Sequence, residues 1–201
     1  MTIPAFIEAR RSIRAFRSDP VDRELLDGLV TAACLAPAPH HSRPWRFVVI
    51  DTPAGKADLA AGMGAQWRVD LGADGVDPAR IDELVEASRV KITTAPALVL
   101  GCLTWDGLDR YPDETRLRAE HGMALLSLGA AVENLMLTAA DAGLASCWVA
   151  APIFCPDAAR TALALPDDWS PTALVLLGHP SPDYVPRERP EIPLDTLRTH
   201  R

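Results

Sequence analysis

The chain has 201 residues, and its apolar fraction of 48% is enough for a hydrophobic core and far from a disordered composition. The formal net charge of −7 argues against a general affinity for nucleic acid or an anionic membrane surface, so any bound anion must be held by local cations. We expect one domain over residues 1–201, no membrane span and, because the amino terminus lacks the order of a signal peptide, a cytoplasmic location.

The first predicted elements are a helix, a loop and a strand. Residues 22–35 have the apolar spacing of a helix, with Asp22 as the expected N-cap. Three prolines exclude a helix or a central strand over residues 36–44, so we predict a structured loop there. The β-branched and aromatic residues at 45–50 indicate a strand.

Two helices and a buried strand are predicted next. The helices cover about 53–71 and 78–92, and a Gly-Ala-Asp-Gly turn at 72–75 joins them. Residues 97–103 are almost entirely apolar, which is typical of a strand that is buried on both faces.

A long helix is predicted over about 117–142. It is apolar nearly all round, so protein must cover both of its sides. A chain of this length has few elements with which to surround such a helix. We therefore predict a homodimer in which a second copy supplies the missing cover.

The last elements are strands at 145–149 and 173–177, with a short helix near 156–164 between them. A proline-rich tail follows. Because helices and strands do not alternate strictly, an α+β layer fits the order better than a doubly wound sheet.

The four cysteines have no CxxC spacing. Cys34, Cys102 and Cys147 lie in apolar segments, where a thiol behaves as a small hydrophobic group, and we expect them to be structural. For Cys155 a functional role stays open.

Basic clusters stand out in this acidic chain, at residues 10–14, 43–46 and 187–189. A guanidinium offers a phosphate two charge-assisted hydrogen bonds, so these clusters suit a phosphate, and a solvated basic surface is the alternative. The segment Gly62-Met63-Gly64 lacks a third glycine and does not lie between a strand and a helix. This argues against a Rossmann or P-loop site.

The adjacent His40 and His41 raise the question of a metal. They lie on a proline loop with no cysteine or carboxylate at ligand spacing, so we predict no metal site. The alternatives are a pocket rim that binds an anionic substrate or donates a proton, and a purely structural role.

Four segments, in chain order, resemble the nitroreductase family of flavin enzymes. They are the basic segment Arg-Arg-Ser-Ile-Arg-Ala-Phe at 10–16, the proline loop and strand at 36–47, the segment Ala-Gly-Leu-Ala-Ser-Cys-Trp at 142–148, and the closing Gly-His-Pro and Arg-Glu-Arg at 178–189. The matches are in register over nearly the whole chain. The resemblance implies a central, mostly antiparallel sheet flanked by helices, a long central helix at a dimer interface, and FMN bound between the subunits.

A narrower resemblance follows from the proline loop, where His41 and Arg43 replace the family's usual Asn and Gln. With the segment 63–71 and with Tyr-Pro-Asp at 111–113, it is similar to the C-terminal flavin domain of the bifunctional coenzyme F420 (deazaflavin) biosynthesis protein. This resemblance implies the reduction of a dehydro precursor of F420 with FMNH2. The glutamate-ligase domain that precedes the flavin domain in that family is absent from this chain, so no ligase activity is expected.

The resemblance also assigns roles by position. Arg10, Arg11 and Ser12 would contact the FMN phosphate and ribityl chain, and Arg187 and Arg189 would close over the same phosphate. No catalytic side chain is nominated, because the flavin carries the hydride chemistry.

The remaining assignments concern the flavin ring and the substrate. Arg14 would lie by the pyrimidine edge, where a fixed cation stabilises the negative charge of the reduced ring. Pro152, Ile153 and Phe154 would pass near the N5 edge. The rim residues for an anionic small-molecule substrate would be His40, His41 and Arg43.

Two other functions stay open. One is a general NAD(P)H-dependent nitroreductase or quinone reductase on the same scaffold. The other is a non-catalytic flavin- or deazaflavin-binding module, and turnover with a reductant would distinguish it from both enzymes.

Overall fold

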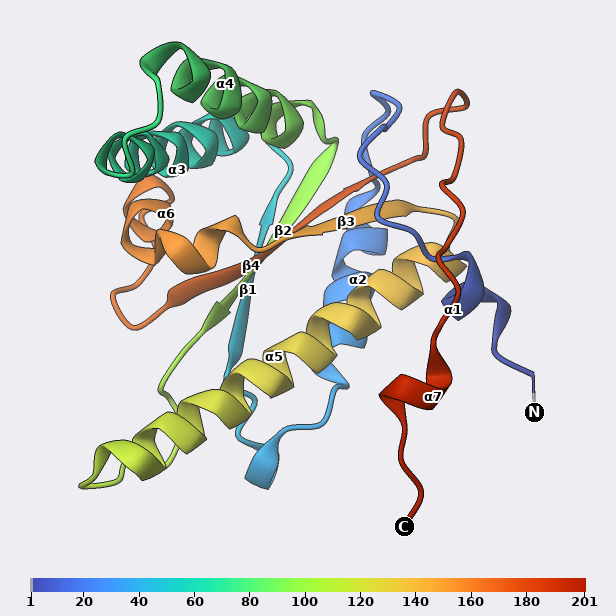
Figure 1. Ribbon diagram of the computed structural model, residues 1–201, viewed down its shortest axis with the longest axis vertical. Coiled ribbons are helices and arrows are strands. Elements are labelled where there is room, and N and C mark those ends of the chain that lie inside the picture. The colour runs from blue at the N-terminus through green and yellow to red at the C-terminus, as the bar shows by residue number, and fades with distance from the viewer. Residues whose placement is uncertain (1) are drawn as a thin grey trace.

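A four-stranded antiparallel sheet crosses the middle of the computed structural model, which describes residues 2–201 (Figure 1). Its strand order is β1-β2-β4-β3. The strands are β1 (Trp45–Ile50), β2 (Ala97–Leu103), β3 (Ala145–Val149) and β4 (Ser170–Gly178). The predicted α+β class and antiparallel sheet are confirmed.

Helices cover both faces of the sheet (Figure 1). On one face lie α2 (Arg23–Cys34) and α5 (Glu114–Asp141). The other face carries α3 (Pro53–Ala73), α4 (Pro78–Thr94) and α6 (Pro156–Ala162). Short elements complete the chain: α1 (Ala5–Ala9), the 3₁₀ turns η1 (Pro39–His41) and η2 (Ala151–Phe154), and α7 (Leu194–Leu197).

The two cores follow from the alternation of side chains along the central strands. In β2 and β4, Val99 and Val175 belong to the cluster with α2 and α5, whereas the adjacent Leu100 and Leu174 belong to the cluster with α3 and α6. All seven residues of β2 are buried, as predicted for a strand covered on both faces.

The sequence predicted the strands better than the helix ends. Three strands, β1, β2 and β3, begin and end at the predicted residues. The long helix instead begins at Glu114, because the Asp113 carboxylate accepts a hydrogen bond from the backbone N–H of Arg116 and caps its first turn. The predicted cap at Asp22 is confirmed by its bonds from the N–H groups of Glu24 and Leu25.

Its own chain covers only one side of the α5 helix. Leu128, at 1% exposure, packs into the core beside α2 and the sheet, whereas Leu126 on the opposite side is 76% exposed and Met123 is partly exposed. By length and composition alone α5 could cross a membrane, but this packing is that of a core helix. Its uncovered side agrees with the expectation that a second copy supplies cover.

A buried lysine joins α3 to the connection between α4 and β2. The Lys56 ammonium, in the first turn of α3, donates to the carbonyl oxygens of Ala95 at 2.7 Å and Pro96 at 3.3 Å. These carbonyls lie where α4 ends and β2 begins, so Lys56 fixes the entry to the central strand. Burial lowers the pKa of Lys56, and the nearby Asp51 charge partly opposes that effect.

Replacing Lys56 with Met should therefore destabilise the fold although it keeps a side chain of similar length. We expect the free energy of unfolding to fall by about 1.5–3 kcal/mol, because two buried carbonyls lose a charged donor. Urea denaturation followed by circular dichroism measures this change. Lys91→Met, at an exposed position of α4, is the matched control, and equal stability of the two variants would contradict the argument.

Candidate functional site

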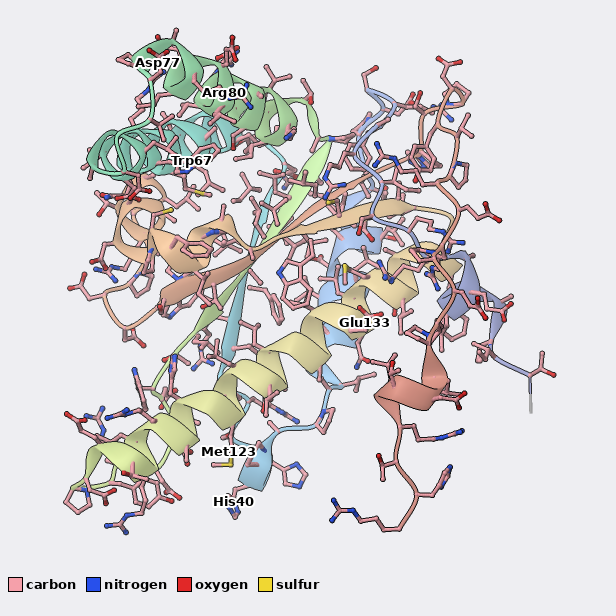
Figure 2. The ribbon with its side chains drawn as sticks, viewed as in Figure 1. His40, Trp67, Asp77, Arg80, Met123 and Glu133 are labelled. Carbon is pink, nitrogen blue, oxygen red and sulfur yellow. The ribbon has the colours of Figure 1, made fainter. Side chains whose placement is uncertain are left out.

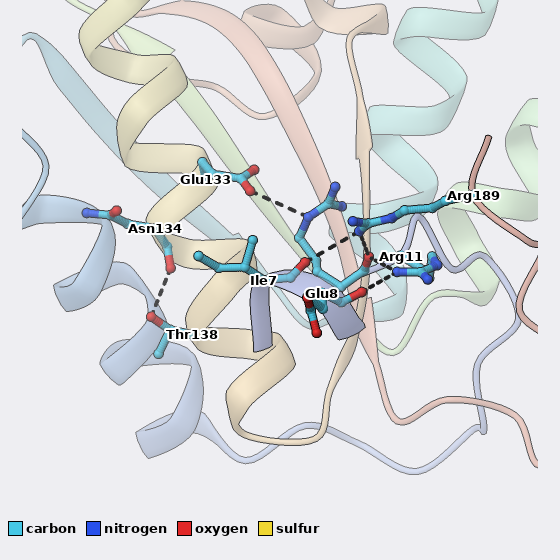
Figure 3. A network of polar contacts seen from close by, with 8 residues as sticks. Ile7, Glu8, Arg11, Glu133, Asn134, Thr138 and Arg189 are labelled. Atoms are coloured by element: carbon cyan, nitrogen blue, oxygen red, sulfur yellow. Dashed lines mark hydrogen bonds and ion pairs between the residues drawn. The ribbon is translucent and has the colours of Figure 1, made fainter. Parts of the chain in front are cut away.

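The basic residues at the two ends of the chain meet beside α5. Arg10 follows α1, and its Nε lies 3.5 Å from Glu133 Oε1 on α5 (Figure 3). Arg189, from the tail, donates to the carbonyl oxygens of Ile7 and Arg10. The fold thus brings Arg10 and Arg189 together although they are 179 positions apart in sequence.

Arg11 and Ser12 lie where this segment runs along the sheet. Ser12 pairs with Ser146 of β3 in a parallel bridge, and the N–H of Ile13 donates to the Ser146 carbonyl at 2.9 Å. Arg11 Nη1 donates to the carbonyls of Glu8 at 2.5 Å and Arg10 at 3.0 Å, while its Nε is buried and has no partner within residues 2–201.

A cavity of about 140 Å³ lies beneath this segment. Arg10, Arg11 and Ser146 line it together with Gly143, just beyond the carboxyl end of α5. It has room for a phosphate-sized group but not for a whole flavin. Two of the residues that line it, Arg10 and Arg11, carry a guanidinium group.

Arg14 is exposed and lies near the middle of β3. Burial raises the pKa of the Cys147 thiol, and the positive charges of Arg14, Lys91 and Arg10 partly offset that rise. All three cations are therefore close enough to the Cys147 thiol to influence its ionisation. Lys91 was missed in the sequence, because it belongs to no motif and reaches this place only through the packing of α4.

The other predicted residues around the cofactor occupy the tail and η2. Arg187 is exposed, and within the described part of the chain its guanidinium forms no hydrogen bond or ion pair. In η2, Pro152 is buried, whereas the side chains of Ile153 and Phe154 reach solvent.

The thiols of Cys102, Cys147 and Cys155 are buried, and burial raises the pKa of each. Burial raises the pKa of Cys102 to about 12 and also raises the pKa of Cys155, whose Sγ donates to the Ala151 carbonyl at 3.5 Å. This fits a structural role for both. Over residues 2–201, no three histidine, cysteine, aspartate or glutamate side chains come close enough together to hold a metal.

The predicted substrate loop has a strained backbone. His40, His41 and Arg43 have φ values of 52°, 53° and 47°, a left-handed conformation that residues other than glycine seldom adopt. Each such residue costs of the order of 1 kcal/mol or more unless its surroundings fix it. The Oγ of Ser42, between them, is buried and has no partner within residues 2–201.

This loop and the basic segment lie at different places along α5. In Figure 2 His40 lies toward the part of α5 that contains Met123 and away from Glu133, the residue that pairs with Arg10. Met123 and Glu133 are separated by ten residues of one helix, or about 15 Å. A single chain therefore does not bring the predicted substrate loop to the predicted phosphate site.

A larger cleft, of about 660 Å³, lies at the amino end of α5. Trp105, Tyr111 and His121 line it together with arginines. Tyr111 was recognised in the sequence only as part of a family motif. No cleft was predicted there, because the loop that contributes Trp105 has no periodic pattern.

Comparison with known proteins identifies the scaffold. Residues 7–179 match the family model described as the nitroreductase family. The chain is 32% identical to an NADH dehydrogenase of Thermus thermophilus, over 94% of this chain and 90% of that protein. It is 25% identical to a 5,6-dimethylbenzimidazole synthase of Rhodospirillum rubrum, over 98% and 91% of the two chains.

The solved structures agree on the fold. An FMN-bound nitroreductase of Bacteroides fragilis superposes with a TM-score of 0.73 at 22% identity, and the match covers 94% of each chain. At that identity the likeness speaks for the shared architecture alone.

Proposed function

Because the chain belongs to the nitroreductase family, we propose that it is an FMN-dependent oxidoreductase and that it reduces a dehydro precursor of the deazaflavin coenzyme F420. We assign the whole chain to one FMN-binding domain. The observation that carries the cofactor assignment is the meeting of Arg10 and Arg189 beside Arg11, whose buried Nε has no partner within residues 2–201.

The residues present fit the phosphate of FMN. A phosphate oxygen would complete the hydrogen bonding of Arg11 Nε, and Arg10 and Arg189 would add charge-assisted bonds. The carboxyl end of α5 carries roughly half a negative elementary charge, which repels an anion. The positive charge of two or three guanidinium groups is larger than this. The chain also shares its architecture with a nitroreductase of Bacteroides fragilis that was solved with bound FMN.

Bound FMN would supply hydride transfer, and the chain's own residues would orient and protect the ring. We assign Arg14 to the pyrimidine edge, where its fixed charge would favour the reduced form. Pro152, Ile153 and Phe154 would lie along the N5 edge, where the two exposed side chains would exclude water. Arg187, without a partner in the described chain, would join Arg189 at the phosphate, and Ser12 would hold the ribityl chain.

We propose that a second copy of the chain completes the site, because the exposed stripe at Met123 and Leu126 needs apolar cover. The His40–Arg43 loop lies toward this part of α5. We propose a homodimer in which α5 forms the interface and the His40–Arg43 loop reaches the flavin of the partner.

The substrate assignment rests on that loop. His40, His41 and Arg43 are all exposed, and their cationic and ionisable groups suit phosphate or carboxylate oxygens better than a neutral nitroaromatic. A deazaflavin precursor that carries such groups fits this rim.

A second candidate is a general NAD(P)H-dependent nitroreductase or quinone reductase. The 32% identical relative is named an NADH dehydrogenase, which favours a nicotinamide electron donor. The other relative, a 5,6-dimethylbenzimidazole synthase, illustrates that one scaffold serves several chemistries, so the site must decide the substrate.

Cofactor binding gives the first test. The purified protein should release FMN on denaturation, and Arg10→Ala should weaken FMN binding by about 1.5–3 kcal/mol, the range for a hydrogen bond to a charged group. Flavin fluorescence titration measures the affinity. Arg80→Ala, which removes an exposed arginine of α4, is the control. Equal affinity in both variants would place the phosphate elsewhere, and a protein that takes up no FMN would refute the cofactor.

The dimer can be tested at Leu126. We expect light scattering to give about twice the chain mass of 21.7 kDa and Leu126→Asp to yield a monomer that has lost FMN, because the charge lies in the apolar interface. Leu128 is unsuitable for this test because it lies in the core of the single chain. Val90→Asp, on the exposed surface of α4, is the control. A stable Leu126→Asp monomer that retains FMN contradicts the shared site.

The substrate is tested by product mass. With FMN reduced, the dehydro precursor should gain two hydrogens, and Arg43→Gln should weaken its binding by roughly tenfold while leaving FMN affinity unchanged. Arg80→Gln should alter neither. If the precursor neither binds nor gains hydrogen while nitroaromatics or quinones turn over with NAD(P)H, the general reductase is the correct function.

A further inference from the structure

The cleft at the amino end of α5 has the size of a small-molecule site. Its volume of about 660 Å³ lies within the range of ligand pockets in proteins. The loop after β2 supplies Trp105, Arg110 and Tyr111, and the first two turns of α5 supply Glu114, Leu117, Arg118 and His121. None of these lining residues belongs to the proposed flavin site.

Aromatic surface is available in this cleft. The rings of Trp105 and His121 stack with centroids 5.8 Å apart and planes 23° apart. Trp105 is nevertheless 40% exposed, so this stack leaves much of the indole uncovered. The Tyr111 ring already has the Arg116 guanidinium over it, at 5.0 Å. The open surface for a further ring is therefore that of Trp105 and His121.

One cation in the cleft is uncommitted. Arg118 pairs with Glu114 at 2.6 Å, and Arg116 outside the lining pairs with Asp113 at 2.6 Å. Arg110 forms no ion pair or hydrogen bond within residues 2–201, although the chain has an excess of seven acidic charges. Its guanidinium is thus free to bind an anion with two parallel hydrogen bonds.

Anion binding in this cleft would not depend on the backbone N–H groups at the amino end of α5. Asp113 already accepts from the Arg116 N–H at 3.0 Å and caps α5. The loop is also held in place, because the buried Glu120 carboxylate accepts from the Asp109 N–H at 3.3 Å, next to Arg110. A loop fixed in this way loses little freedom when a ligand binds.

We propose that this cleft binds a planar aromatic molecule that carries a carboxylate or a phosphate. The aromatic system stacks on Trp105, and the anionic group bonds to Arg110. This assignment does not rest on the proposed reductase activity, because equilibrium binding measures it without turnover. Within one chain His121 precedes Glu133 by twelve residues, or about 18 Å along α5, so the ligand does not touch the proposed phosphate site.

The test uses the full chain loaded with FMN, with no reductant present. Naphthoate and its neutral counterpart naphthalenemethanol are titrated by isothermal calorimetry, and flavin absorbance reports any loss of FMN. We expect saturable binding of naphthoate at one site per chain, at least about fivefold tighter than the neutral compound. That ratio is the value of a charge-assisted hydrogen bond discounted for solvent exposure.

Four variants, one of them a control, separate the contributions of ring and charge. Arg110→Gln should remove the preference for naphthoate and leave the neutral compound unaffected, whereas Arg80→Gln should change neither. Trp105→Ala should weaken both compounds, and Trp105→Phe should restore much of the binding because it keeps a ring. Circular dichroism checks that each variant is folded.

The contrary outcomes are equally specific. Absence of saturable naphthoate binding, or equal naphthoate affinity in the wild type and Arg110→Gln, overturns the proposal. Binding that Trp105→Ala leaves unchanged, or that displaces FMN, places the compound elsewhere and overturns it as well.

Discussion

Burial of the α5 helix constrains the rest of the structure. With 28 residues it is about 42 Å long, and it extends across one face of the sheet, where it contacts α1, α2, β2 and β3. One side packs on α2 and on the sheet, and this packing fixes which residues of β2 and β4 face it. The same helix holds Glu133 beside Arg10 and carries Glu120 and His121 some 18 Å away. The separation between the phosphate-sized cavity and the aromatic cleft is therefore a property of one rigid element.

The sequence predicted those parts of the fold that depend on local pattern. Three strands are runs of apolar or β-branched residues between turn signals, and their limits were predicted to the residue. The start of α5 was placed three residues late, because its first turn is polar and only the Asp113 cap marks it. The side of α5 that its own chain leaves uncovered was not predictable: Leu126 and Leu128 differ by two positions in a helix that is apolar all round, and only the packed structure distinguishes them.

The candidate site was predicted less completely, because its parts come together through tertiary packing. The meeting of Arg10 with Arg189 was anticipated only from the family resemblance, since nothing local connects the two termini. Glu133 and Lys91 belong to none of the sequence motifs, so only the packed structure places them near Arg10 and Cys147. The cleft around Trp105 arises where an irregular loop folds over a helix end, and neither element predicts it alone.

The backbone of the His40–Arg43 loop limits which residues evolution can exchange there. A positive φ excludes β-branched side chains and favours glycine, asparagine, aspartate and histidine. His41 stands where the family resemblance has asparagine, and both residue types tolerate this conformation. The exchange therefore alters the ionisation of the rim while its shape is conserved. Related enzymes could diverge in ligand preference at this position without any rearrangement of the main chain.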